Sequence, residues 1–160
     1  VYGTPYSGKI LMRNTAQPGD YICISSPTGR ARRGLNDWKN TNNNSEYLTD
    51  YLRPLAKIEL GKTIVNFASA CIDTSDGLLA DLGKILKLSE CGALIYLDDI
   101  PITTDIDDIN SGDDYDLCFT VPKDKFDNNY FKIGEVTSDR QIKLISNKGY
   151  DINIKGYEHF

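Results

Sequence analysis

The sequence predicts an α+β domain in which helices pack on a mixed β-sheet. In the second half of the chain, short apolar and β-prone segments outnumber helical ones. No regular alternation of strand and helix is sustained, as a parallel α/β sheet would require. With 160 residues, of which 40% are apolar, the chain can bury one core but is short for two ordinary domains. We therefore expect a single domain over residues 1–160.

The first half of the chain predicts one strand followed by short helices. The strand at 21–25 is entered through a turn in which Pro18 fixes φ and Gly19 supplies a positive φ. Helical segments are expected at 28–35, 46–52 and 58–67, the last from its helical spacing of apolar residues. The Asn-rich stretch 36–45 has no periodicity, and we interpret it as a mobile surface loop.

The clearest helix of the sequence follows a short buried-type strand at 69–73. Its apolar positions recur at steps of three and four: Leu78, Leu79, Leu82, Ile85, Leu86 and Leu88. Gly92 follows as a stop signal. Strands are then expected at 93–97, 115–121, 131–136, 142–146 and 150–154, with an acidic connection at 98–110.

Composition excludes several classes of protein. A formal net charge of −5 argues against a nucleic-acid-binding surface or a membrane-surface helix, because both require concentrated Lys and Arg. The four cysteines are scattered singly and only one histidine is present, which favours buried, reduced thiols over zinc or disulfides. The apolar runs are too short to cross a bilayer, so we expect a cytoplasmic protein. The chain begins at Val1 rather than Met, which suggests part of a longer protein.

The DTSDG loop (residues 73–77) is the first candidate site. Asp73, Ser75 and Asp76 cluster where the strand at 69–73 meets the long helix. Such a turn offers backbone N–H groups and a helix dipole to an anion, while the two carboxylates suit Mg²⁺. The alternative is an ordinary helix start, with Thr74 or Ser75 as the N-cap and Asp76 as a favourable first-turn charge.

The GDDYD loop (residues 112–116) is the second candidate site. A glycine and acidic residues lead directly into the apolar strand expected at 115–121. Carboxylates at the entrance of a strand can bind a metal or a cationic ring. An ordinary acidic turn explains the same composition.

Four motifs, taken in order, resemble the C-terminal domain of bacterial thiamine-monophosphate kinase, a member of the aminoimidazole ribonucleotide synthetase superfamily. They are I-D-T-S-D-G-L-L-A-D-L-G at 72–83, S-G-D-D-Y-D-L-C-F-T-V-P at 111–122, I-G-E-V-T at 133–137 and G-Y-E-H-F at 156–160. The resemblance implies the superfamily fold and, for the full-length protein, transfer of a phosphoryl group from ATP to thiamine monophosphate with Mg²⁺. It also implies a homodimeric parent whose N-terminal ATP-binding domain is absent here, with residues 1–20 as an interdomain linker.

The resemblance also implies residue roles. Asp73 and Asp76 match metal ligands, and Ser75 matches a contact to the nucleotide phosphates. Arg13, in the S-G-K-I-L-M-R-N-T-A-Q-P-G-D stretch at 7–20, matches a nucleotide-contacting arginine. A surface cation is the alternative for Arg13.

Two further matches concern the substrate. Asp113 takes the place of a glutamate that contacts the substrate in the family, and its side chain is one methylene shorter. Tyr157 matches an aromatic residue whose ring either stacks on the cationic thiamine heterocycle or anchors the C-terminus. Two other functions remain open: a different ATP-dependent synthetase of the superfamily, and a non-catalytic binding domain that keeps the fold.

Overall fold

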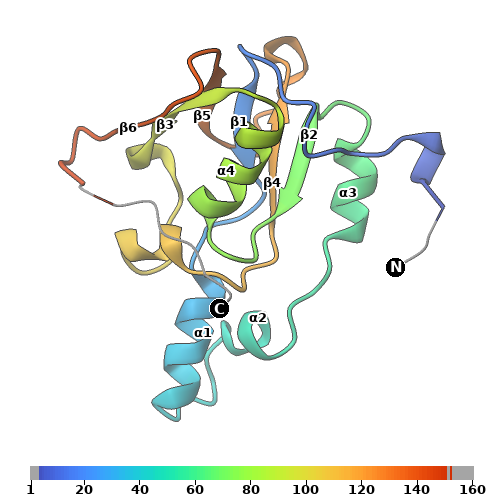
Figure 1. The fold of residues 1–160 in the computed structure, drawn as a ribbon. Coiled ribbons are helices and arrows are strands. Elements are labelled where there is room, and N and C mark those ends of the chain that lie inside the picture. The colour runs from blue at the N-terminus through green and yellow to red at the C-terminus, as the bar shows by residue number, and fades with distance from the viewer. Residues whose placement is uncertain (1–3, 151, 153–160) are drawn as a thin grey trace.

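The computed structural model describes residues 4–150 and 152 (Figure 1). Within these residues, the strands form a single six-stranded sheet in the order β2-β4-β1-β5-β3-β6. The strands are β1 (Tyr21–Ile24), β2 (Ala70–Asp73), β3 (Gly92–Tyr96), β4 (Leu117–Val121), β5 (Phe131–Thr137) and β6 (Ile142–Ile145). Neighbours pair antiparallel except β3 and β6, which are parallel. The predicted α+β class with a mixed sheet is confirmed.

Some helices pack on the sheet, and others lie beyond one end of it. The α-helices are α1 (Arg30–Lys39), α2 (Leu48–Leu52), α3 (Ile58–Ile64) and α4 (Leu78–Leu88). Short 3₁₀ helices are η1 (Tyr6–Gly8), η2 (Leu97–Asp99), η3 (Ile106–Asn110) and η4 (Lys123–Lys125). In Figure 1, α4 lies across the sheet, whereas α1 and α2 lie together at one end of the molecule.

The period of two along the strands divides the core into two clusters. Ile22 and Ile24 of β1 point to the larger cluster, which contains the buried face of α4. Cys23, between them, points to the smaller cluster with Phe119 of β4 and Ile64 of α3. The sheet is therefore buried on both faces, by α4 on one and α3 on the other.

The apolar stripe of α4 forms as the sequence predicts except at Leu88, which is 56% exposed at the end of the helix. Leu78, Leu79, Leu82, Ile85 and Leu86 are almost fully buried against the sheet. Burying one such side chain contributes about 1.5–3 kcal/mol, so this helix is firmly fixed. Its N-terminus holds the DTSDG loop in place.

Several expected boundaries differ from the structure, among them the end of α3, which lies at Ile64 rather than 67. Helix α1 extends to Lys39, four residues beyond the expected end at 35, so the start of the expected 36–45 loop is helical. Gly34 lies so close to α2 that a Cβ there would be 2.1 Å from the Tyr47 carbonyl oxygen, and Asp37 accepts a hydrogen bond from the Ser45 hydroxyl at 2.6 Å. Strand β4 begins at Leu117 rather than 115, because Tyr115 has a positive φ of 50°.

The structure agrees with the remaining sequence predictions to different extents. The acidic connection at 98–110 contains η2 and η3. The strand expected at 150–154 lies largely outside the described residues. All four cysteines are free, as predicted. Within the described part of the chain, no helix combines the length and apolar character needed to span a bilayer.

Candidate functional site

The DTSDG and GDDYD loops lie side by side. Strands β2 and β4 pair antiparallel with Asp73 opposite Leu117, which places the end of one strand beside the start of the other. The Thr74 amide donates to the Asp116 carbonyl oxygen at 2.8 Å, and the Tyr115 amide donates to the Thr74 carbonyl oxygen at 2.9 Å. Two motifs about forty residues apart in the sequence therefore form one surface.

Two glycines allow the loops to approach each other. A Cβ on Gly112 would lie 2.4 Å from the Ser75 carbonyl oxygen, which accepts the Asp113 amide at 3.0 Å. Gly77 has a φ of 123°, and a Cβ there would lie 3.0 Å from the Asn110 carbonyl oxygen. Any larger residue at either position would push the backbones apart.

Asp81, which was not among the predicted site residues, organises the DTSDG loop. Its carboxylate is fully buried, and one oxygen accepts the amides of both Ser75 and Asp76 at 2.8 Å. The backbone amides of Ser75 and Asp76 already donate to Asp81. The expectation that these two amides are free to bind an anion is therefore wrong. The alternative of a helix cap by Thr74 or Ser75 is also wrong, because the N-cap residue is Gly77 and no side chain caps the helix.

Asp76 and Asp81 share a cation. The Lys84 ammonium contacts the Asp76 carboxylate and lies 2.7 Å from Asp81 Oδ1. The hydrogen bond to Asp76 is the leading cause of a raised pKa of Lys84. The predicted metal ligand Asp76 thus already faces a positive charge, and its side chain remains 22% exposed.

Asp73, the other predicted metal ligand, opens onto solvent. Its side chain is 46% exposed, and Oδ1 lies 4.0 Å from Arg13 Nη2. The segment before Arg13 is fixed against β2, where the Cys71 amide donates to the Met12 carbonyl oxygen at 3.0 Å. The structure therefore brings Arg13 beside the DTSDG loop, although the two are far apart in the sequence.

Asp113 and Tyr115 are the outward-facing residues of the GDDYD loop. Both have positive φ, 68° and 50°, and both are exposed. The Tyr115 hydroxyl donates to Asp113 Oδ1 at 3.3 Å, and this carboxylate is the main cause of a raised pKa of Tyr115. Asp113 thus lies where a substrate can reach it, whereas Tyr157 lies outside the described residues.

Asp114 and Asp116 face inward and carry structural contacts. Asp114 caps α1 by accepting the amides of Gly29 at 2.7 Å and Ala31 at 2.9 Å, and burial raises the pKa of its carboxyl group. Asp116 is 6% exposed and pairs with Lys57 Nζ at 2.8 Å. Outward-facing and inward-facing residues thus alternate along the loop.

The basic stretch at 30–33 is neutralised by carboxylates. Arg30 pairs with Asp50 at 2.8 Å, and Arg33 pairs with Asp37 at 2.9 Å. Arg32 pairs with Asp105 at 2.6 Å and with the fully buried Asp108 at 2.7 Å. The pairs of Arg30 and Arg32 attach α1 to its surroundings, whereas the Arg33 pair lies within the helix.

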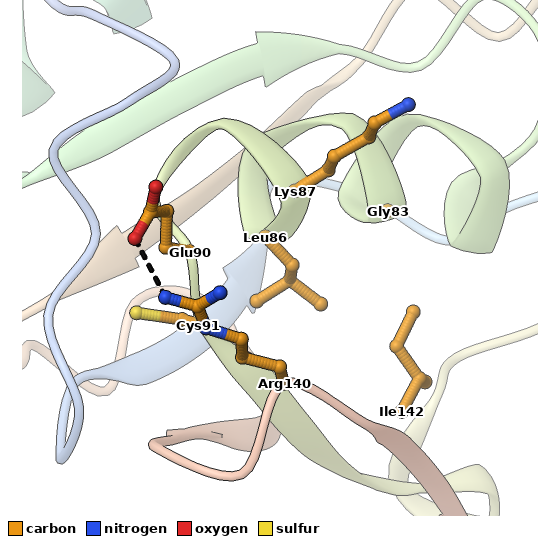
Figure 2. A pocket seen from close by; sticks show the side chains of 7 residues that line it. All are labelled: Gly83, Leu86, Lys87, Glu90, Cys91, Arg140 and Ile142. Atoms are coloured by element: carbon orange, nitrogen blue, oxygen red, sulfur yellow. Dashed lines mark hydrogen bonds and ion pairs between the residues drawn. The ribbon is translucent and has the colours of Figure 1, made fainter.

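Two pockets lie in different parts of the described structure. A pocket of about 370 Å³ beside the DTSDG loop is lined by Pro54, Ala56, Lys57, Asp73, Tyr115 and Leu117. A second, of about 410 Å³, lies toward the far end of α4. Arg140 Nη2 lies 2.7 Å from Glu90 Oε2 there, and Figure 2 shows this ion pair near Leu86 and Ile142. Among the described residues, the second pocket contains none of the predicted site residues.

The described residues 4–150 and 152 include no group of three or more His, Cys, Asp or Glu side chains arranged to hold a metal ion. Asp73 and Asp76 nevertheless suit a hard cation, because carboxylate oxygens are the ligands that Mg²⁺ prefers. Held by these two alone, a metal would need further ligands from phosphate, water or another part of the protein.

Comparison with known proteins places this site in context. No protein-family model matches the chain. The chain is 35% identical to thiamine-monophosphate kinase of Buchnera aphidicola subsp. Schizaphis graminum and 33% identical to that of Salmonella typhimurium, in each case over all of this chain and 58% of the relative. It thus spans little more than half the length of these curated relatives.

Solved structures agree with the sequence comparison. AaThiL complexed with AMPPCP and TMP superposes with a TM-score of 0.82 at 26% identity, over 96% of this chain and 55% of that one. Hydrogenase maturation protein HypE in complex with ATP superposes at 0.74 with 15% identity, over 93% of this chain and 54% of that one, which shows a shared fold alone. The resemblance to thiamine-monophosphate kinase is therefore confirmed along the chain, as is the superfamily fold.

Proposed function

We propose that this chain is the C-terminal part of a thiamine-monophosphate kinase, which transfers a phosphoryl group from ATP to thiamine monophosphate and yields thiamine diphosphate. The main observation behind the proposal is that the DTSDG and GDDYD loops lie side by side and form one surface. One loop presents carboxylates suited to metal and phosphate, and the other presents an acid and an aromatic ring on the substrate side. Similarity to kinases of this name along the whole chain supports the assignment.

The proposed reaction requires little proton transfer by the protein. The acceptor is a phosphate monoester whose second pKa is about 6, so its attacking oxygen is largely ionised at pH 7. No strong general base is needed, and positioning with charge neutralisation supplies the catalysis. The absence of an assigned base in the described loops is consistent with this reaction.

Asp73 and Asp76 are proposed to hold Mg²⁺, and Ser75 and Arg13 to contact the nucleotide phosphates. Bound Mg²⁺ would neutralise phosphate oxygen charge and align the two anions. The protein's own contribution is orientation: Asp81 fixes the backbone of Ser75 and Asp76, and β2 fixes Asp73. Asp113 and Tyr157 are proposed to contact the thiamine moiety.

The remaining length of the relatives suggests that another part of the full-length protein completes the site. We propose an N-terminal ATP-binding domain, joined through residues 1–20, in a cytoplasmic homodimer. This chain alone would then be inactive. Light scattering of the full-length protein tests the dimer, and adding the upstream domain should restore turnover.

A coupled ADP-release assay tests the proposed reaction. The full-length protein is assayed with ATP, Mg²⁺ and either thiamine monophosphate or the acceptors of other superfamily synthetases. We expect turnover with thiamine monophosphate only. Turnover with another acceptor would favour a different synthetase, and saturable ligand binding without any ADP release would favour a non-catalytic domain.

A further inference from the structure

The pocket beside Asp73 contains a lysine whose position suits phosphate binding. The Lys57 pocket, as we call it, is bounded by the segment before α3 on one side and by Asp73, Tyr115 and Leu117 on the other. Lys57 is the one cation among its described lining residues. A pocket of about 370 Å³ accommodates a small phosphorylated heterocycle.

Buried contacts hold the Lys57 ammonium in place. Its Nζ lies 2.8 Å from Asp116 Oδ1, and the Asp116 side chain is only 8% exposed. The same carboxylate oxygen accepts the hydroxyls of Ser26 at 3.0 Å and Ser25 at 3.3 Å. The anchor of the lysine is thus itself fixed to the end of β1 and the start of β4.

The ammonium keeps capacity for a ligand. An ammonium has three N–H donors, and its ion pair with Asp116 requires one of them. The Lys57 side chain remains 35% exposed and lines the pocket. An anion entering the pocket would therefore meet a preorganised donor, and little side-chain entropy would be lost on binding.

The Lys57 pocket carries charges of both signs. Asp73 is the other charged lining residue, and its carboxylate would repel a dianionic phosphate. Among the described lining residues, Lys57 supplies the one positive charge that counters this repulsion. The Tyr115 ring and Pro54 supply the flatter, less polar surface that a heterocycle needs.

We infer that Lys57, held by Asp116, binds the phosphate group of the acceptor monoester in this pocket. The inference rests on the proposed function and adds a substrate-binding residue to it. It also gives the inward-facing Asp116 a role: Asp116 is a positioning residue that acts through Lys57.

The test compares ligands with and without the phosphate. Calorimetry of the full-length protein measures the affinities of thiamine monophosphate and of unphosphorylated thiamine, for wild type and Lys57→Met. We expect the wild type to prefer the phosphorylated ligand, and Lys57→Met to reduce that preference about tenfold or more, as loss of a charge-assisted hydrogen bond would. Lys57→Arg should retain most of the preference.

The matched control is Lys62→Met. Lys62 lies on α3, is partly exposed like Lys57 and pairs with Glu59 at 2.6 Å, outside the pocket. This substitution should leave the preference unchanged. Because Lys57→Met leaves the buried Asp116 carboxylate without its cation, the double variant Lys57→Met/Asp116→Asn is measured as well, and it should lose the preference to the same degree while melting nearer to wild type.

The outcomes separate the inference from the proposed function. An unchanged preference in Lys57→Met and in the double variant would overturn the inference even if the kinase reaction is observed. A shift in the KM for ATP with no shift in the KM for thiamine monophosphate would also overturn it, by placing Lys57 on the nucleotide side. A wild type that binds neither ligand would overturn both.

Discussion

Asp81 provides the most direct test of how the DTSDG loop is built. Its fully buried carboxylate accepts the amides of Ser75 and Asp76 and pairs with Lys84. Asp81→Ala leaves two part-buried N–H donors without an acceptor, each costing about 1–2 kcal/mol. Loss of the partly exposed Lys84 pair adds little. The expected destabilisation is about 2–4 kcal/mol.

Asp81→Asn separates the two contributions, because the amide keeps an oxygen for both N–H donors and loses only the charge. We expect it to cost about 1 kcal/mol. Urea unfolding monitored by circular dichroism measures both variants, and with a slope of about 2 kcal/mol per molar the midpoint of Asp81→Ala should fall by about 1–2 M.

Asp124→Ala, at an exposed aspartate in η4, is the control and should stay within about 0.5 kcal/mol of wild type. A cost for Asp81→Ala no larger than this control would refute the assignment of Asp81 as the acceptor that shapes the loop. Equal costs for the Asn and Ala variants would show that the charge, rather than the acceptor oxygen, is what matters.

Three further predictions concern the loops, pH and the thiols. Gly112→Ala should lower the melting temperature, because its Cβ would meet backbone at 2.4 Å, whereas Gly61→Ala in α3, with nothing within 4 Å, should raise or preserve it; the reverse order in a thermal melt would contradict the close approach of the loops. The ion pair with Lys143 lowers the pKa of Asp139 to about 2, below its unfolded value of about 3.9, so this pair should stabilise the protein above pH 4 and be lost as the pH falls toward 2. A carboxyl NMR titration that gave a pKa near 4 would show that the pair is not formed. Burial raises the pKa of Cys23 to about 12 and raises those of the other three thiols, so the native protein at pH 8 should react with DTNB far more slowly than protein unfolded in guanidinium, and equal rates would count against buried thiols.

Much of the fold was predictable because local patterns agree with it. The apolar period of α4 and the β-prone runs at 21–25 and 93–97 each mark an element that the structure contains. The errors arise where contacts between distant residues decide the outcome. Helix α1 is longer than its local sequence suggests, and its added turn carries Asp37, which accepts a hydrogen bond from Ser45 beyond the helix end.

The site was predictable in its outward-facing residues but not in its supports. Asp73, Asp76 and Asp113 stand in recognisable motifs, whereas Asp81 and Lys57 act through contacts made only after folding. One signal for Asp81 was present in the sequence: an acid three residues after Leu78, within the apolar stripe of a helix, must be paired when buried. The expectation of free amides at the turn is wrong because the buried Asp81 carboxylate already accepts two of them.

The DTSDG loop is proposed to bind metal-bound phosphate. Isothermal titration of the full-length protein with Mg²⁺ and AMPPCP, for wild type, Asp76→Ala and the exposed control Asp124→Ala, tests it most directly. We predict Mg²⁺-dependent binding to wild type and the control, and a loss of about tenfold or more in affinity for Asp76→Ala. Unchanged affinity in Asp76→Ala, accompanied by a lower melting temperature, would contradict the claim and leave Asp76 only as the partner of Lys84.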